Sequence, residues 1–167
     1  LSAESTATGV AASVTVSGQL QGDVATGGAL SEASTTAESA ASAIESGGGN
    51  DTITNATDVI ATTDATATGV SVGVFVGITG DGDITNTEAE AAGAALSDAS
   101  SVANATSTGI SSGDGVDDVW NTGELGLLAN SHATGVAVSL SVAGSASGDV
   151  EGGAVSDASV VAESYAT

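Results

Sequence analysis

The side chains best suited to chemistry in this chain are carboxylates that stand beside glycines. The 167 residues include 21 Asp and Glu, one His, and no Lys, Arg or Cys. Carboxylate and carbonyl oxygens are the hard ligands that calcium prefers, and Gly-Asp pairs are also common in plain turns between strands. Both interpretations stay open for the candidate calcium ligands, which lie in three glycine-rich segments: Asp51, Asp81, Asp83, Asp114, Asp117 and Asp118.

Other catalytic or metal sites lack the residues they need. With no Cys and with His132 as the single histidine, a zinc site and a Cys–His nucleophile pair are excluded. A serine triad would have to use Ser131 beside His132, and no elbow motif surrounds any serine. Paired carboxylates of the glycosidase kind need one asymmetric cleft, whereas acidic residues here recur in repeated turns. We therefore predict that the protein is not an enzyme.

The charge of the chain limits its partners. A formal net charge of −21 without any basic side chain excludes binding to a nucleic-acid backbone and to an anionic membrane surface. A compact state with this charge repels itself unless salt or calcium screens it. No apolar run approaches the length of a membrane span. Because the chain opens with Leu1, we interpret it as a mature or excised segment of something longer.

The composition predicts a core of small side chains. Apolar residues make up 41 % of the chain and charged residues 13 %, so the chain can bury surface. Pro and Met are absent, and Phe75, Trp120 and Tyr165 are the only aromatic residues, expected as local core fillers or contacts between units. Such a composition favours closely stacked backbones over a bulky centre.

The sequence repeats itself. Ala-Thr-Gly-Val occurs three times, beginning at positions 7, 67 and 133, which gives periods of 60 and 66. GALSEAS, AALSDAS and GAVSDAS follow these copies in turn, at 28–34, 94–100 and 153–159. Self-similarity at such periods indicates stacked units that contact only their neighbours. We predict a tail of a preceding repeat at 1–6, followed by repeats at 7–66, 67–132 and, incomplete, 133–167.

Each repeat is expected to supply about three strands. Val10, Val14 and Val16 alternate with smaller residues, which predicts a half-buried strand whose valines form a dry interior. Residues 28–45 fit either a strand with a close-packing Ala/Ser face or a helix, and the density of Ser and Thr favours the strand. A glycine-rich turn and a third strand through Ile53 follow.

These patterns predict an all-β fold, either a repetitive β-solenoid or a stacked β-sheet fibre, built from repeats with a period of 60 to 66. Whether the strands run parallel or antiparallel is left open. With no capping segment at either end, exposed strand edges are expected to pair with another copy.

Two segments resemble a known motif. SGGGNDTIT at 46–54 and SGDGVDDVW at 112–120 resemble the G-G-x-G-x-D-x-U-x nonapeptide of RTX, or haemolysin-type, calcium-binding repeats, and the chain also resembles large bacterial repeat adhesins. The resemblance implies a parallel β-roll, with Asp51 and Asp117 as calcium ligands and Ile53 and Val119 as buried plugs. Residues 55–63 and 121–129 do not continue the motif.

Three functions are compatible with these features. The first is a structural subunit or segment of a secreted extracellular filament, sheath or surface adhesin, stabilised by calcium and joined to copies of itself, to carbohydrate or to a cell surface. The second is a calcium-responsive folding or export module of a larger secreted enzyme or toxin. The third is an ice- or polysaccharide-binding repeat that uses the threonines of 62–68. N-glycosylation patterns occur at Asn50, Asn55 and Asn104.

Overall fold

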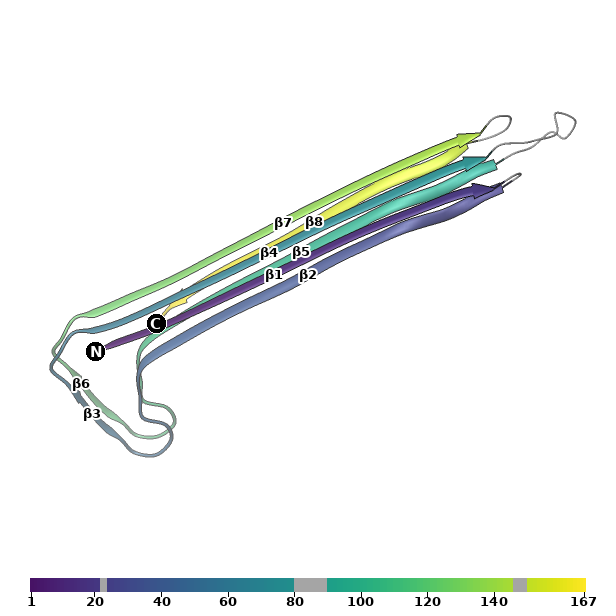
Figure 1. Ribbon diagram of the computed structural model, residues 1–167. Coiled ribbons are helices and arrows are strands. Elements are labelled where there is room, and N and C mark those ends of the chain that lie inside the picture. Colours follow the sequence, from purple (N-terminus) through teal and green to yellow (C-terminus); the bar gives the residue numbers. More distant parts are fainter. Residues whose placement is uncertain (22–23, 80–89, 146–149) are drawn as a thin grey trace, which may run out of the picture.

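The computed structural model describes residues 1–21, 24–79, 90–145 and 150–167 of an elongated, all-β molecule (Figure 1). Six long strands run side by side, and two short ones form an arm at the end where both chain termini lie. No helix occurs in these ranges, and therefore none that could cross a membrane. The strands are β1 (Ser2–Gln21), β2 (Val24–Glu45), β3 (Thr52–Asn55), β4 (Val59–Thr79), β5 (Glu90–Ser111), β6 (Asp118–Asn121), β7 (Leu125–Ser145) and β8 (Val150–Ala166).

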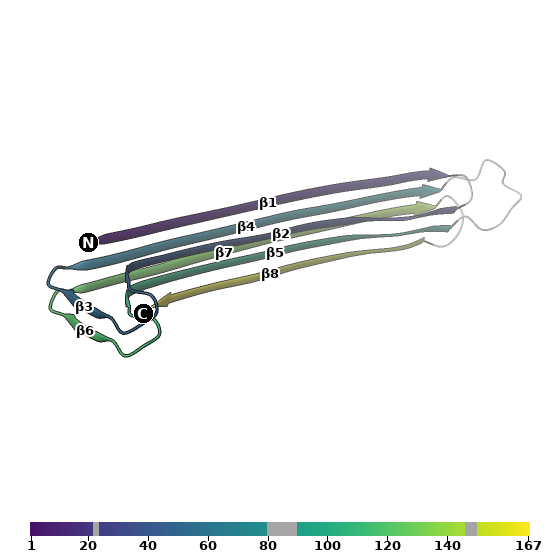
Figure 2. The same cartoon turned by 90° about the horizontal axis from the view of Figure 1, so that it is seen from below.

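All strand pairs are parallel. One sheet, here called sheet A, has the order β1-β4-β7, and a second, sheet B, has the order β2-β5-β8. The two sheets lie face to face, and β3 pairs with β6 in the arm (Figure 2). This arrangement is compatible with a β-solenoid. It confirms the strand interpretation of 28–45 and decides for parallel pairing.

The pairing register follows the sequence alignment in every pair except one. β2 and β5, β3 and β6, and β4 and β7 all pair at the offset of 66 that the repeats predict, as in Ala29 with Ala95. In β1, however, Gly9 pairs with Ala67, which displaces β1 by two positions from the alignment of the Ala-Thr-Gly-Val strings. An even displacement keeps each side chain on its face of the sheet. It also stacks Ser13 on Ser71, which both bond to Ser31.

The interior between the sheets is lined by small residues, and the predicted valine interior is wrong. In β4 the alternating set that includes Ala61, Ala65 and Ala67 is almost fully buried, whereas the valines of sheet A point outward. Val14 and Val16 are 70 % and 72 % exposed. We call this outward surface of sheet A the valine face: Ala12, Val14, Val16, Val70, Val72, Val74, Val76, Val136, Val138, Leu140 and Val142.

Hydroxyl groups join the two sheets across this interior. Ser71 Oγ donates to the carbonyl oxygen of Ser31 at 2.7 Å, and Ser101 Oγ donates to that of Thr134 at 2.7 Å. Ser97 bonds in the same way to the carbonyl oxygen of Val138 at 2.6 Å. Since a serine hydroxyl reaches only a short distance from its own backbone, the sheets must approach closely, which leaves no room for opposed valines.

One aromatic side chain enters this narrow layer, and near the arm the aliphatic side chains of Val59 and Leu127 also point into it. Phe75 is fully buried and packs against Ala29 and Ala95 of the opposite sheet. Its place in the core confirms the prediction of a local core filler. The other two aromatic residues remain on the surface, with Trp120 67 % and Tyr165 55 % exposed.

The close approach predicts a steric cost at Gly73. A Cβ atom there would lie 2.8 Å from the carbonyl oxygen of Leu96 and 2.8 Å from Ser97 Oγ. Gly73→Ala should lower the free energy of unfolding by about 1–3 kcal/mol, as overpacked cores do, measured by urea denaturation followed by circular dichroism. Gly126→Ala is the control, since its Cβ would meet nothing closer than 3.6 Å. Equal effects of the two substitutions would contradict the narrow spacing.

Candidate functional site

The segments that resemble the calcium motif form stacked turns at the base of the arm. Residues 46–51 lie against residues 112–117, so that Gly49 N donates to the carbonyl oxygen of Asp114 at 2.7 Å. Four glycines of these turns have positive φ angles, which other L-residues rarely adopt: Gly47 (91°), Gly49 (131°), Gly113 (78°) and Gly115 (149°). The glycines of the motif are therefore explained by the turn and by the close stacking of one turn on the next.

The structure brings Asp51 and Asp117 together. Asp117 Oδ1 accepts a hydrogen bond from the backbone N–H of Asp51 at 2.9 Å, and Asp118 N donates to the carbonyl oxygen of Asp51 at 2.8 Å. The carboxylate of Asp51 itself has one oxygen, Oδ2, that is buried and has no hydrogen-bond partner. A buried carboxylate oxygen without a donor is costly, and a cation would satisfy it.

The remaining candidate ligands are exposed side chains or lie beyond the described ranges. Asp114 and Asp118 are exposed to solvent, while Asp81 and Asp83 lie outside the described residues. Within the described ranges, no three acidic or histidine side chains are close enough together to hold a metal ion. Calcium binding therefore stays a prediction, centred on Asp51 and Asp117.

The two residues expected as buried plugs differ from each other. Ile53 is 8 % exposed, as the resemblance implies, but Val119 is 46 % exposed, so its burial as a plug is wrong for this structure. Both occupy equivalent positions, since Ile53 pairs with Val119.

An asparagine ladder stabilises the arm beyond these turns. Asn55 Nδ2 donates to Asn121 Oδ1 at 2.7 Å and to the carbonyl oxygen of Thr57 at 2.6 Å. Asn55 is also buried, at 8 % exposure. Because its amide nitrogen is hydrogen-bonded and its side chain is buried, Asn55 is unsuitable for glycosylation in the folded chain.

A row of carboxylates crosses the outer face of sheet B, and the sequence analysis missed it. Glu32 pairs with Asp98, which pairs with Asp157, and all three side chains are exposed. Like charges directly opposite on neighbouring strands destabilise a sheet. The signal was present in the aligned strings GALSEAS, AALSDAS and GAVSDAS, which carry the acid at the same place.

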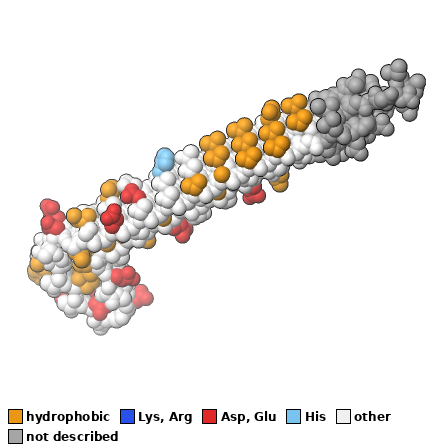
Figure 3. All heavy atoms as spheres, in the orientation of Figure 1, with side chains coloured by type: hydrophobic (Ala, Val, Ile, Leu, Met, Phe, Trp, Pro, Cys, Tyr) orange, Lys and Arg blue, Asp and Glu red, His pale blue; other side chains and the backbone are white. Residues whose placement is uncertain are grey.

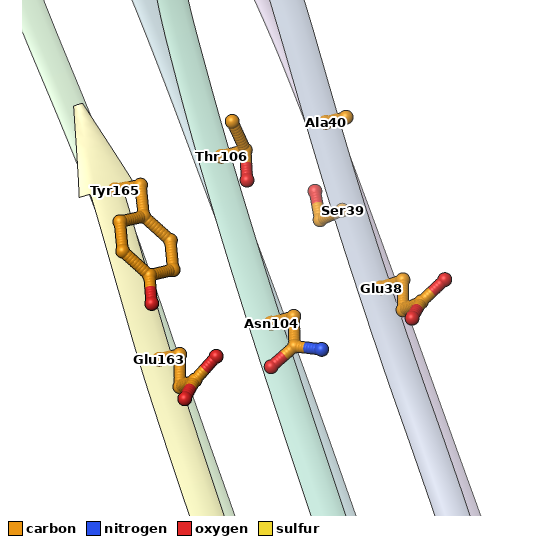
Figure 4. A pocket seen from close by; sticks show the side chains of 7 residues that line it. All are labelled: Glu38, Ser39, Ala40, Asn104, Thr106, Glu163 and Tyr165. Carbon is orange, nitrogen blue, oxygen red and sulfur yellow. The ribbon is translucent and has the colours of Figure 1, made fainter. Parts of the chain in front are cut away.

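A shallow pocket of about 340 Å³ lies further along the same face (Figure 4). Its centre is the row Glu38, Asn104 and Glu163, one residue from each strand of sheet B. Tyr165 lies beside this row, and Asn104 Oδ1 is buried without a hydrogen-bond partner. Acceptors beside an exposed aromatic ring are groups that a polar ligand such as a carbohydrate can contact.

Two further sequence candidates are separated by strand geometry. Ser131 faces inward and hydrogen-bonds to Ser164 at 2.8 Å, whereas His132 faces outward and contacts Thr134 Oγ1 at 3.3 Å. These residues therefore do not form a Ser–His pair. The threonine array is also interrupted, because Thr66 is paired with His132 and Asp64 with Asn130.

Comparison of the chain with protein-family models, with curated proteins and with solved structures gives no match. The interpretation of these surfaces consequently depends on the geometry and chemistry of the chain itself.

The stacked turns provide a matched test. Gly47 and Gly113 have similar φ angles of 91° and 78°, so alanine causes similar backbone strain at both. Only at Gly113 would the new Cβ collide with the neighbouring turn, at 1.5 Å from the carbonyl oxygen of Gly47. Gly113→Ala should therefore abolish hydrogen-exchange protection of the Gly49 and Asp118 amides, while Gly47→Ala should retain most of it. Equal loss would show that the two turns do not stack.

Proposed function

We propose that the chain is a β-solenoid built from repeats with a period of 60 to 66, and that it serves as a structural segment of a secreted extracellular filament, sheath or surface adhesin. The observation that supports this proposal is that both ends of the stacked sheets are long, open sheet edges. β1 and β2 form one end of the stacked sheets, and β7 and β8 form the other. Each of these strands has 17 to 22 residues.

Open edges of this length are templates for further strands. Soluble proteins usually shorten, charge or cover such edges, because unpaired backbone groups recruit other chains. The inward-facing side chains of β8 are also exposed, because no further strand in the described ranges is stacked on β8. Ala33 and Ala99 are 3 % and 0 % exposed, but Ala158, which continues the same row, is exposed. Another copy, or a further repeat of a longer chain, would bury it.

The charge of the chain fits an extracellular structural role. With 21 acidic residues and no Lys or Arg, the stacked repeats repel one another unless ions screen them. Calcium is the divalent cation of the extracellular medium that suits carboxylate ligands. The proposal therefore includes copies of the chain as partners, excludes nucleic acid and anionic membranes, and assigns no catalytic step.

Self-assembly can be tested with two variants of equal charge. Ala158→Glu puts a carboxylate into the row that stacking would bury, so it should prevent filament formation. Ser159→Glu adds the same charge on the outer face, where the equivalent Ser34 stays exposed, and it should leave filaments intact. Negative-stain electron microscopy of both variants and of the wild type, in millimolar calcium and after chelation, provides the measurement.

Monomers of the wild type under both conditions would overturn the filament proposal. Filaments that persist in Ala158→Glu would show that assembly does not use the edge of sheet B. Filaments that dissociate on chelation would assign calcium a role in assembly, whereas indifference to chelation would remove calcium from the proposal.

A second candidate function is a calcium-responsive module that folds on export. The buried, unpartnered Asp51 Oδ2 beside Asp117 favours this candidate. A calcium ion bound there would stabilise the folded state by mass action, since the unfolded chain has no such site. The two functions predict different oligomeric states, because the module remains a monomer when calcium is bound.

The calcium interpretation predicts a residue-specific shift in stability. Calcium should raise the melting temperature of the wild type by several degrees above an ionic-strength-matched sodium chloride control. Asp51→Asn should remove most of this increase, because it neutralises the carboxylate while keeping its size. Glu4→Gln, which neutralises a carboxylate on β1, should retain the increase. Loss of the same amount in both variants would mean general screening of charge, with no site at Asp51.

A further inference from the structure

The valine face, which is one part of the outward surface of sheet A, is an uncharged apolar strip on a highly charged protein. Val14, Val72 and Val138 form one row across the three strands, and Val16, Val74 and Leu140 form the next. The members on the two outer strands are 49 % to 72 % exposed. Figure 3 shows these side chains gathered as regular apolar rows toward one end of the molecule. Such a strip of contiguous apolar surface marks an interaction site.

No charged group interrupts the strip. From the row of Thr68 to the row of Val76, every outward side chain of β1, β4 and β7 in the described ranges is uncharged. The nearest carboxylate on β4 is that of Asp64, six residues before Val70, which is about 20 Å along a strand. The acidic row Glu32, Asp98 and Asp157 lies on the opposite side of the molecule, on the outer face of sheet B.

This distribution of charge indicates that the partner of the valine face is a second copy of the chain. Two copies that meet through their valine faces keep their acidic rows on the outside, as far apart as the sheets allow. The in-register rows of β-branched side chains are also self-complementary, as in the dry interfaces between paired sheets of identical chains. An anionic membrane would instead be repelled by the net charge of −21.

The area of the valine face determines how many stacked chains a stable pairing needs. Four rows on three strands cover about 400 Å², since each outward residue occupies roughly 4.8 Å by 6.7 Å. A stable interface buries about 800 Å² on each partner, so one chain offers about half of what is needed. A stack of two chains doubles the number of strands and reaches this size.

We propose that the valine face is a lateral interface, through which two stacks of this chain pair face to face into a double filament. The inference rests on the proposed filament function and deepens it, because it adds a side-by-side contact to end-to-end stacking. It also explains why the valines lie outside: each sheet A buries them against a second copy, while the Ala/Ser layer holds sheets A and B of one chain together.

Filament width tests the proposal. Wild-type filaments should be double, whereas Val72→Thr/Val74→Thr filaments should be single, because a hydroxyl replaces a methyl at the centre of the contact while β-propensity is kept. Val102→Thr/Val161→Thr makes the same change on the outer face of sheet B and should leave the filaments double. Cryo-electron microscopy cross-sections of the three proteins give the widths directly.

A cross-linking experiment identifies the surface without relying on width. The chain contains no cysteine, so Val72→Cys and Ser100→Cys each introduce a single thiol on opposite outer faces. With a short bismaleimide, Val72→Cys should give covalent dimers in more than tenfold excess over Ser100→Cys.

The outcomes separate this inference from the filament function. Single wild-type filaments, or equal cross-linking of both variants, would overturn the lateral interface and leave the filament function standing. Absence of both filaments and cross-linked dimers would overturn both. Single filaments that bind uncharged phosphatidylcholine vesicles through this face would assign it to a lipid surface and overturn the pairing.

Discussion

Hydrogen bonds from serine hydroxyls to carbonyl oxygens of the facing sheet determine how closely sheets A and B approach. Ser71 and Ser97 make such bonds to opposite sheets, to Ser31 and Val138, at 2.7 Å and 2.6 Å. Each contributes about 0.5–1.5 kcal/mol and satisfies a polar group that would otherwise be buried alone. At this spacing mainly Gly, Ala, Ser and Thr fit between the sheets, and Phe75 is accommodated by facing Ala29 and Ala95. The outward position of the valines follows from this constraint.

The sequence predicted the period of the strands correctly and their inside face wrongly. Alternation at 10–20 and 70–78 indicates a strand, but it does not tell which of the two alternating sets is buried. The assumption that valines are buried ignored the glycines of the other set. Gly69 and Gly73 would each place a Cβ within 2.8 Å of the facing sheet, so glycines recurring on one face are themselves a signal of close packing. The pairing of β2 with β5 in the register of the repeats was predictable from the aligned strings.

Other features depend on information that the aligned strings do not contain. The two-residue displacement of β1 conserves the inside and outside faces, so hydrophobic alternation cannot reveal it. It is set by contacts across the interior, where Ser13 and Ser71 converge on Ser31. For the candidate calcium site, the sequence identified the two glycine-rich turns and the residues Asp51 and Asp117, and the structure shows that they meet. The unpartnered oxygen of Asp51 emerges only when the neighbouring turn covers it.

Placing the small residues inside also separates the charges of the molecule. Because the inner layer is lined mostly by small, uncharged side chains, the acidic row Glu32, Asp98 and Asp157 lies on the outer face of sheet B, and the part of sheet A around Val72 carries no carboxylate. Repulsion between copies is therefore weakest where apolar surface is greatest. The same alternation that allows sheets A and B to meet through hydroxyl groups thus leaves each chain with one face suited to water and one suited to another copy.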